Sequence, residues 1–212
     1  MDLFENLEPR EESLCPGAVL LRKFVLPEES AILAALSQVT SQSPFRYMIT
    51  PGGFRMSVGM SNCGSLGWVT DRSGYRYDPA DPLSGLPWPS MPESFSRLAS
   101  SAARAAGFEN FLPDACLINR YEPGAKLSLH QDKDEHDFTQ PIVSVSLGIP
   151  AVFLFGGMAR SQKTMRINLN HGDVAVWGGP ARLRYHGILP LKEATHPLLG
   201  LCRINLTFRK AG

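Results

Sequence analysis

The sequence RINLTFR, residues 203–209, alternates polar and apolar side chains without a break. A period of two is typical of a β-strand, in which successive side chains point to opposite faces of the sheet. The three apolar residues therefore share one face. The other face holds Arg203, Asn205, Thr207 and Arg209.

Seven more short strands are predicted upstream, each bounded by glycine, proline or polar turn residues. The chain has 19 glycines and 17 prolines in 212 residues, which is high for a helical bundle and ordinary for strands and turns. Eight short strands favour a β-sandwich or jelly roll. The predicted strands are Ala115–Tyr121, Lys126–Gln131, Ile142–Gly148, Val152–Phe155, Met165–Leu169, Asp173–Trp177, Leu183–His186 and Cys202–Arg209.

The first half of the sequence carries two helical patterns instead. One helix is predicted from Pro27, which fits a first helical turn, to about Val39. The other is predicted from Ser90, with Glu93 completing a capping box, to Gly107. The segment between the two helices is rich in proline and is expected to be irregular.

We therefore expect an α+β, mainly β protein that forms one compact unit. Residues 1–113 hold the helices and the irregular segment Ser41–Pro92, and residues 114–212 hold the β-core. The composition of 43% hydrophobic and 19% charged residues argues against disorder. The 21 basic and 20 acidic residues give a net charge of +1, which excludes a polybasic binder that depends on bulk charge.

The sequence also favours a cytoplasmic location. Its four cysteines form no C-x-x-C pair and match no zinc-site spacing, as in a reduced cytosolic protein. Met1–Glu12 is acidic and lacks the apolar core of a signal peptide. Pro141–Ala159 is uncharged, but its alternation and its glycine and proline breaks predict two buried strands rather than a membrane span.

A candidate metal site comes from His130-Gln131-Asp132, which offers an imidazole and a carboxylate two residues apart on one strand face. Such a pair alone is more often a surface feature. His186, at the end of another predicted strand, changes the balance. Two histidines and a carboxylate form the facial triad of non-haem Fe(II) oxygenases. The other histidines, His136, His171 and His196, have no such partner and are interpreted as structural.

The polar face of residues 203–209 is the second candidate. A solvated edge strand would explain it simply. If the face is buried, however, Arg203 and Arg209 need anions, because an unpaired buried guanidinium is costly. A small dicarboxylate would supply them, since arginine matches carboxylate geometry. Asn119 and Tyr121, two residues apart on the first core strand, could bind the same acid.

Together these motifs resemble the Fe(II)/2-oxoglutarate dioxygenases of the AlkB family. The pattern H-x-D, a distal histidine and R-x-N-x-T-x-R carries the resemblance. Segments outside the core match as well, so the resemblance extends over nearly the whole chain. The further matching segments are Thr50-Pro51-Gly52-Gly53, Asn62-Cys63-Gly64, Leu66-Gly67-Trp68, Pro87-Trp88-Pro89 and Asn119-Arg120-Tyr121.

The resemblance implies a double-stranded β-helix (jelly-roll) core with an N-terminal α/β nucleotide-recognition lid. It implies Fe(II) bound by His130, Asp132 and His186, with 2-oxoglutarate and O2 as co-substrates. It assigns the distal carboxylate of 2-oxoglutarate to Arg203 and the carboxylate nearer the metal to Arg209. Asn119, Tyr121 and Asn205 complete the expected co-substrate site.

The resemblance further implies oxidative demethylation of N-alkylated bases such as 1-methyladenine and 3-methylcytosine. Because these lesions are cationic, their pocket should offer aromatic faces and a carboxylate. Single- or double-stranded DNA is the expected partner, with RNA as a further substrate and no obligate protein partner. The expected substrate residues are Trp68, Tyr75, Arg76, Tyr77, Asp134 and Arg160, with Arg72, Lys126 and Lys133 as additional candidates for backbone contacts.

Three other functions remain open. A dioxygenase of the same chemistry could act on RNA or on a protein side chain. A cupin-like module could bind metal without turnover, although it would need no cradle for a dicarboxylate. A zinc hydrolase would need a general base, and no glutamate stands beside the histidine ligands.

Overall fold

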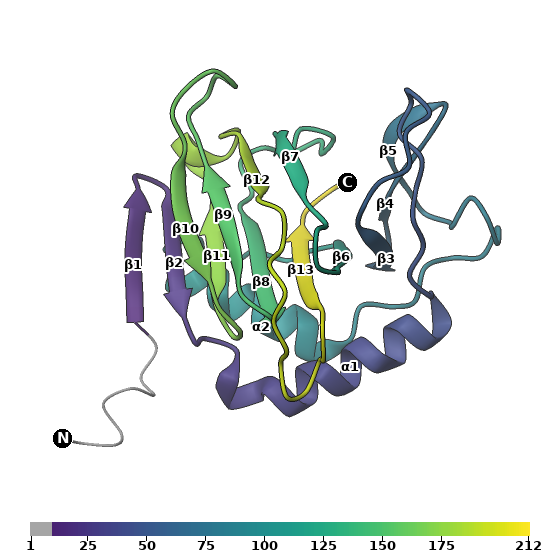
Figure 1. Ribbon diagram of the computed structural model, residues 1–212, viewed down its shortest axis with the longest axis horizontal. Helices are drawn as coiled ribbons and strands as arrows, with labels where there is room; N and C mark the ends of the chain where they lie inside the picture. Colours follow the sequence, from purple (N-terminus) through teal and green to yellow (C-terminus); the bar gives the residue numbers. More distant parts are fainter. Residues whose placement is uncertain (1–9) are drawn as a thin grey trace.

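The computed structural model describes residues 10–212, so most of the acidic segment Met1–Glu12 lies outside the described residues. Two β-sheets face each other, and two helices cover the outer side of the larger one (Figure 1). The fold is the α+β, mainly β jelly roll predicted from the sequence. Among the described residues, no helix is long and apolar enough to cross a membrane.

The major sheet has seven strands in the order β1-β2-β11-β8-β13-β6-β3. The minor sheet has four strands in the order β10-β9-β12-β7, and β4 and β5 form a separate hairpin. The major-sheet strands are β1 (Arg10–Cys15), β2 (Ala18–Arg22), β3 (Gly59–Gly64), β6 (Ala115–Tyr121), β8 (Ile142–Gly148), β11 (Val174–Trp177) and β13 (Arg203–Arg209). The others are β4 (Gly67–Asp71), β5 (Gly74–Asp78), β7 (Leu127–His130), β9 (Ala151–Phe155), β10 (Met165–Leu169) and β12 (His186–Ile188).

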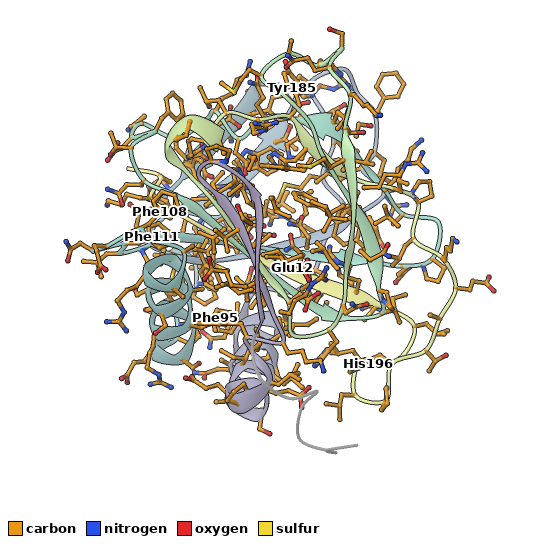
Figure 2. All side chains as sticks on the ribbon, turned by 90° about the vertical axis from the view of Figure 1, so that its left-hand side faces the viewer. Glu12, Phe95, Phe108, Phe111, Tyr185 and His196 are labelled. Atoms are coloured by element: carbon orange, nitrogen blue, oxygen red, sulfur yellow. The ribbon has the colours of Figure 1, made fainter. Side chains whose placement is uncertain are left out.

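The predicted alternation in β13 is confirmed. Ile204, Leu206 and Phe208 lie in the apolar layer between the major sheet and the helices α1 (Glu29–Gln42) and α2 (Glu93–Ala105). Phe208 meets Phe95 of α2 edge to face, with ring centroids 5.8 Å apart. Figure 2 shows Phe95 and Phe111 on this side of the molecule. The polar face of β13 must therefore turn toward the space between the two sheets.

Several sequence-based predictions were wrong in detail. Ser90 caps no helix, because Pro92 is the N-cap in an extended conformation and α2 begins at Glu93. The segment Ser41–Pro92 is not wholly irregular, since it contains β3, β4 and β5. Strands β1 and β2 were not predicted, and residues 183–185 precede β12 rather than forming it. A short 3-10 helix, η1 (Leu26–Glu28), precedes α1, and another, η2 (Gly179–Ala181), follows β11.

The division at residue 113 remains a prediction. Strands from both sides of it are neighbours in the major sheet, with β3 paired to β6 and β2 paired to β11. The apolar residues between the sheets likewise come from both parts, for example Met60 and Phe153. The two predicted parts therefore share one sheet and one apolar layer.

Candidate active site

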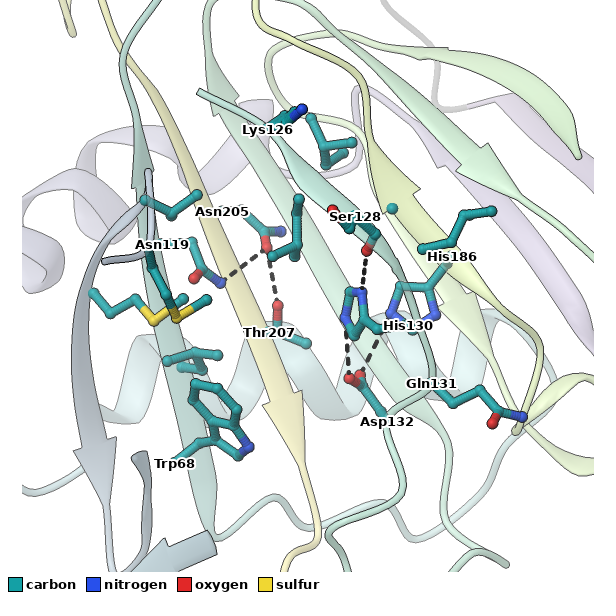
Figure 3. A pocket seen from close by; sticks show the side chains of 18 of the residues that line it. Trp68, Asn119, Lys126, Ser128, His130, Gln131, Asp132, His186, Asn205 and Thr207 are labelled. Carbon is teal, nitrogen blue, oxygen red and sulfur yellow. Dashed lines mark hydrogen bonds and ion pairs between the residues drawn. The ribbon is translucent and has the colours of Figure 1, made fainter. Parts of the chain in front are cut away.

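A cavity of about 750 Å³ lies between the two sheets and opens beside the β4–β5 hairpin. Its walls combine the polar face of β13 with residues of β6, the end of β7 and the start of β12. Figure 3 shows Trp68 across this cavity from the group formed by His130, Asp132 and His186. Segments that are far apart in sequence therefore supply one site.

The three candidate metal ligands come together because β7 pairs with β12. His130 is the register partner of His186, and the two ring centroids are 4.3 Å apart. A Cβ atom at Gly187 would lie 2.6 Å from the carbonyl oxygen of Leu127, so only glycine permits this close strand approach. Asp132 follows β7 and turns its carboxylate toward both rings.

The donor atoms are arranged for a metal ion. Nε2 of His130 lies 3.5 Å from Oδ1 of Asp132, and Nε2 of His186 lies 3.7 Å from Oδ2. One donor atom from each residue fits within 4.8 Å of the others. Each histidine directs Nδ1 at a backbone carbonyl, that of Ser128 at 2.9 Å and that of Arg184 at 3.1 Å. A carbonyl only accepts, so Nδ1 carries the proton and Nε2 keeps its lone pair for a metal.

The charge states suit the same purpose. Burial, together with the nearby His130, lowers the pKa of His186 to about 4, so its imidazole is neutral at pH 7. Burial alone would raise the pKa of Asp132, but the Arg209 guanidinium and both histidines hold it well below its ordinary value. A neutral imidazole and an ionised carboxylate are the forms that bind metal.

Arg203 and its neighbours form a cradle for an anion. The side chain is 1% exposed, and its guanidinium lies over the Tyr121 ring at 5.0 Å. Nη2 donates to Oγ of Ser146 at 3.0 Å, whereas Nε and Nη1 have no partner. Within residues 10–212, no carboxylate oxygen lies within 4 Å of this cation. Burial lowers the pKa of Arg203, because the charged guanidinium is removed from water without a nearby anion. A bound carboxylate would supply the negative charge that balances it.

The rest of the predicted co-substrate site lines the same cavity. Asn119 and Asn205 are register partners on β6 and β13, and Oδ1 of the buried Asn119 has no hydrogen-bond partner. Arg209 also lies on the wall, but its Nε and Nη2 donate to Oδ2 of Asp132 at 3.0 and 2.7 Å. The two unpartnered guanidinium nitrogens of Arg203 are donors and fit a carboxylate of a small dicarboxylate beside the candidate metal ligands.

The predicted substrate residues divide into two groups. Trp68, Tyr75, Asp134 and Arg160 line the cavity. The indole of Trp68 donates from Nε1 to Oδ2 of Asp134 at 2.8 Å and stacks on Tyr75, with ring centroids 5.7 Å apart and 20° between planes. An aromatic face and a carboxylate are thus held together at the opening.

Arg76 and Tyr77 are not on the cavity wall. Arg76 is held by Asp71 at 3.0 Å and by Asp78 at 3.4 Å. The hydroxyl of Tyr77 donates to Oε1 of Glu135 at 2.7 Å. Alternation along β5 explains why Arg76 is not on the cavity wall, because it points to the opposite face from Tyr75 and Tyr77. Tyr77 shares the face of Tyr75 but lies at a different depth.

Lys126 and Lys133 line the cavity, whereas Arg72 does not. Trp177 lies on the wall with its ring centroid 4.9 Å from that of His186. His171 and His196 lie outside the cavity, where their rings stack at 4.2 Å and His171 also contacts Glu29. His196 is labelled in Figure 2. His136 is likewise not on the wall.

Sequence reasoning missed two buried charged residues behind the metal ligands, Glu135 and Arg182. They are 5% and 3% exposed and form an ion pair of 3.1 Å. Glu135 belongs to the charged run Lys133-Asp134-Glu135, in which no pattern distinguishes a buried carboxylate from a solvated one. Arg182 carried no sequence signal that would separate it from a surface arginine.

Comparison with known proteins agrees with this geometry. The profile of the 2OG-Fe(II) oxygenase superfamily matches residues 17–209. The Escherichia coli protein named alpha-ketoglutarate-dependent dioxygenase AlkB is 59% identical over all of this chain and 98% of its own length. The protein of the same name from Salmonella typhimurium is 60% identical over the same shares. The solved structure of OsALKBH1 superposes with a TM-score of 0.82 at 32% identity, covering 95% of this chain and all of the other.

Proposed function

Because this chain belongs to the 2OG-Fe(II) oxygenase superfamily, we propose that it oxidatively demethylates N-alkylated bases, such as 1-methyladenine and 3-methylcytosine, in nucleic acid. The observation that carries the proposal is a single cavity. It holds a His-Asp-His group, an unpaired buried arginine, and an aromatic ring hydrogen-bonded to a carboxylate. The last of these features suits a flat, cationic ligand.

The enzyme is an Fe(II)/2-oxoglutarate-dependent dioxygenase. His130, Asp132 and His186 would hold the metal through Nε2, a carboxylate oxygen and Nε2. When bound, Fe(II) and 2-oxoglutarate reduce dioxygen and hydroxylate a C–H bond of the substrate, with release of succinate and carbon dioxide. The carbonyls of Ser128 and Arg184 fix the ring orientation of both histidines before any ligand arrives.

We assign the distal carboxylate of 2-oxoglutarate to Arg203. Its unpaired nitrogens and the Tyr121 ring beneath it form a preorganised site for an anion. Asn119 offers an amide group on the same wall, and Asn205, whose amide nitrogen donates to Ser144 and Val145, lies beside it. Arg209 contacts Asp132 and is proposed to hold the carboxylate near the metal with its remaining donor capacity.

The base is proposed to stack on Trp68 with its positive charge facing Asp134. The Trp68–Asp134 hydrogen bond fixes the indole plane, and Tyr75 supports the ring from its other side. Alkylation of the Watson–Crick edge blocks pairing, which lowers the energy needed to flip the base out of a duplex. After hydroxylation, the hydroxymethyl group leaves the ring nitrogen as formaldehyde and the base is restored.

Nucleic acid is the substrate class, because the relatives include a human protein named nucleic acid dioxygenase ALKBH1 as well as the AlkB proteins. Lys126, Lys133 and Arg160 lie at the cavity and are proposed to contact the phosphate backbone. With so few cations and a net charge of +1, we expect modest, salt-sensitive affinity and a preference for single strands. The cytoplasmic location also remains a prediction, which fractionation of expressing cells would test.

The test is an anaerobic titration with Fe(II) and 2-oxoglutarate, followed by oxygen and an oligonucleotide carrying one 1-methyladenine. Formaldehyde and succinate should form in equal amounts. Absence of formaldehyde when metal and co-substrate are demonstrably bound would exclude base demethylation. Parallel reactions with methylated RNA and with a methyl-lysine peptide would separate DNA activity from RNA or protein activity.

A further inference from the structure

Glu135 is a buried carboxylate, and nothing in the proposed reaction so far uses it. Its oxygens meet three different groups. Oε2 accepts from Nη2 of Arg182 at 3.1 Å, and Oε1 accepts from the Tyr77 hydroxyl at 2.7 Å. Nε of Arg209 lies 3.3 Å from Oε1. A buried carboxylate with this many partners is fixed in one orientation.

The contacts of Glu135 close a ring around the metal ligand Asp132. Arg182 donates through Nη1 to the backbone carbonyl of Asp132 at 2.7 Å. Arg209 donates to Oδ2 of the Asp132 carboxylate at 2.7 Å. Both guanidinium groups that hold Asp132, one at its backbone and one at its side chain, therefore also contact Glu135.

The ring is balanced in charge, with two carboxylates facing two guanidinium groups. It joins the loop after β7 to η2, which leads to the ligand His186, and to β13, which carries the co-substrate residues. Tyr77 adds strand β5 of the lid hairpin, which also carries Tyr75 beside the base site. Burial raises the pKa of Tyr77, so its hydroxyl keeps its proton and donates.

We propose that Glu135 is a positioning residue that sets the orientation of Asp132 and Arg209 and connects them to the lid through Tyr77. This inference rests on the proposed roles of Asp132 and Arg209, and it predicts an effect on two ligands at once. Without the Glu135 charge, Arg182 is a buried cation that keeps two backbone carbonyls and the Phe138 ring but no anion, and Arg209 loses one of its two anions. The Asp132 carboxylate is then held less firmly.

The direct test compares Glu135→Gln with Glu193→Gln, which removes an exposed carboxylate outside the cavity. We expect Glu135→Gln to weaken Fe(II) and 2-oxoglutarate binding by about tenfold to a hundredfold, as outer-shell changes commonly do. Glu193→Gln should leave both unchanged. Binding is read from the visible absorption of the anaerobic Fe(II)–2-oxoglutarate complex, so the result does not depend on which base is demethylated.

Tyr77→Phe tests the connection to the lid and removes a single hydroxyl. It should leave Fe(II) and 2-oxoglutarate binding within about twofold, because the proposed charged ring is intact, and raise KM for the methylated oligonucleotide several-fold. In the Glu135→Gln background the same substitution should have little further effect on KM. If Tyr77 instead touches the substrate, the two effects on KM will be additive.

Three results would overturn the proposal. The first is a Glu135→Gln protein that melts like the wild type and binds Fe(II) and 2-oxoglutarate normally. The second is a Tyr77→Phe protein with an unchanged oligonucleotide KM, which remains decisive if Glu135→Gln does not fold. The third is a change confined to the oligonucleotide KM in Glu135→Gln, which would make Glu135 a substrate contact.

Discussion

Replacing Arg203 by methionine should weaken 2-oxoglutarate binding and at the same time stabilise the ligand-free protein. The guanidinium is 1% exposed and has two nitrogens without a partner. Its replacement gives up the Ser146 hydrogen bond and the contact with the Tyr121 ring, together worth about 2–3 kcal/mol. It also removes a desolvation cost of several kcal/mol for a buried charge that no carboxylate balances.

The net gain in the free energy of unfolding should be about 2 kcal/mol. For a chain of 212 residues this raises Tm by about 4–8 °C. Binding changes in the opposite direction, because each hydrogen bond from a cation to a carboxylate contributes about 1.5–3 kcal/mol. Loss of one to two such bonds raises the Kd for 2-oxoglutarate by roughly 100-fold.

Calorimetry of the apoprotein measures the first effect, and anaerobic titration with 2-oxoglutarate measures the second. Arg209→Met is the matched control, since this arginine is equally buried but already balanced by Asp132 and Glu135. Its loss should destabilise the apoprotein by about 3–5 kcal/mol. An Arg203→Met protein that melts below the wild type, or that binds 2-oxoglutarate normally, would refute the reasoning.

Four further predictions concern the metal, the base, pH and salt. His130→Ala should reduce formaldehyde release to background, and full activity would show that the ligand assignment is wrong. Trp68→Ala should raise KM for the oligonucleotide about tenfold or more through loss of a stacking contact of about 1–3 kcal/mol, with a smaller change in kcat. The unfolding free energy of the apoprotein should be highest above about pH 6.5 and should fall by up to about 3 kcal/mol as the pH drops to about 4. The reason is that His186 takes up its proton at a higher pH in the unfolded chain than in the folded protein. Denaturant titrations of the wild type and of His186→Gln should therefore differ in this pH range. Lys126→Ala and Arg160→Ala should each reduce the slope of log affinity against log salt by about 0.7, and an unchanged slope would exclude a phosphate contact.

The strands of the β-core could be predicted because each shows a local pattern of β-forming residues bounded by turn residues. In β13 the alternation over Arg203–Arg209 matched the observed faces residue by residue. Strand β3 could not be found in this way, because its sequence GMSNCG lacks β-branched and aromatic residues. It is held by pairing with β6 on one side. In addition, the Asn62 amide donates to the backbone carbonyl of Trp68 and accepts from its backbone N–H, both at 3.0 Å. Tertiary contacts therefore supply what the local sequence does not.

The site shows the same limit at the level of single side chains. Period-two reasoning brought His130 and Asp132 to one face, and the distal His186 completed the group. The family resemblance, in turn, suggested Arg76 and Tyr77 as substrate residues, and the structure turns one toward two aspartates and the other toward Glu135. The sequence reports neither the depth of a lid residue nor the burial of one carboxylate in a charged run.

The two faces of β13 explain how the fold can hold a group as costly as an unpaired guanidinium. On one face, Leu206 and Phe208 are fully buried against the helix layer, and complete burial of such side chains contributes about 1.5–3 kcal/mol each. Pairing with β6 and β8, together with this packing, fixes the backbone of β13. The polar face of the strand therefore cannot rotate toward water. Arg203 is therefore kept in the cavity even without an anion. The free-energy cost of burying its guanidinium is met when the protein folds, so it does not weaken co-substrate binding. A substitution that loosens the helix side, such as Phe208→Ala, should consequently weaken 2-oxoglutarate binding although its side chain lies on the opposite face. Normal 2-oxoglutarate affinity in a folded Phe208→Ala protein would show that the cradle is held by its own contacts alone.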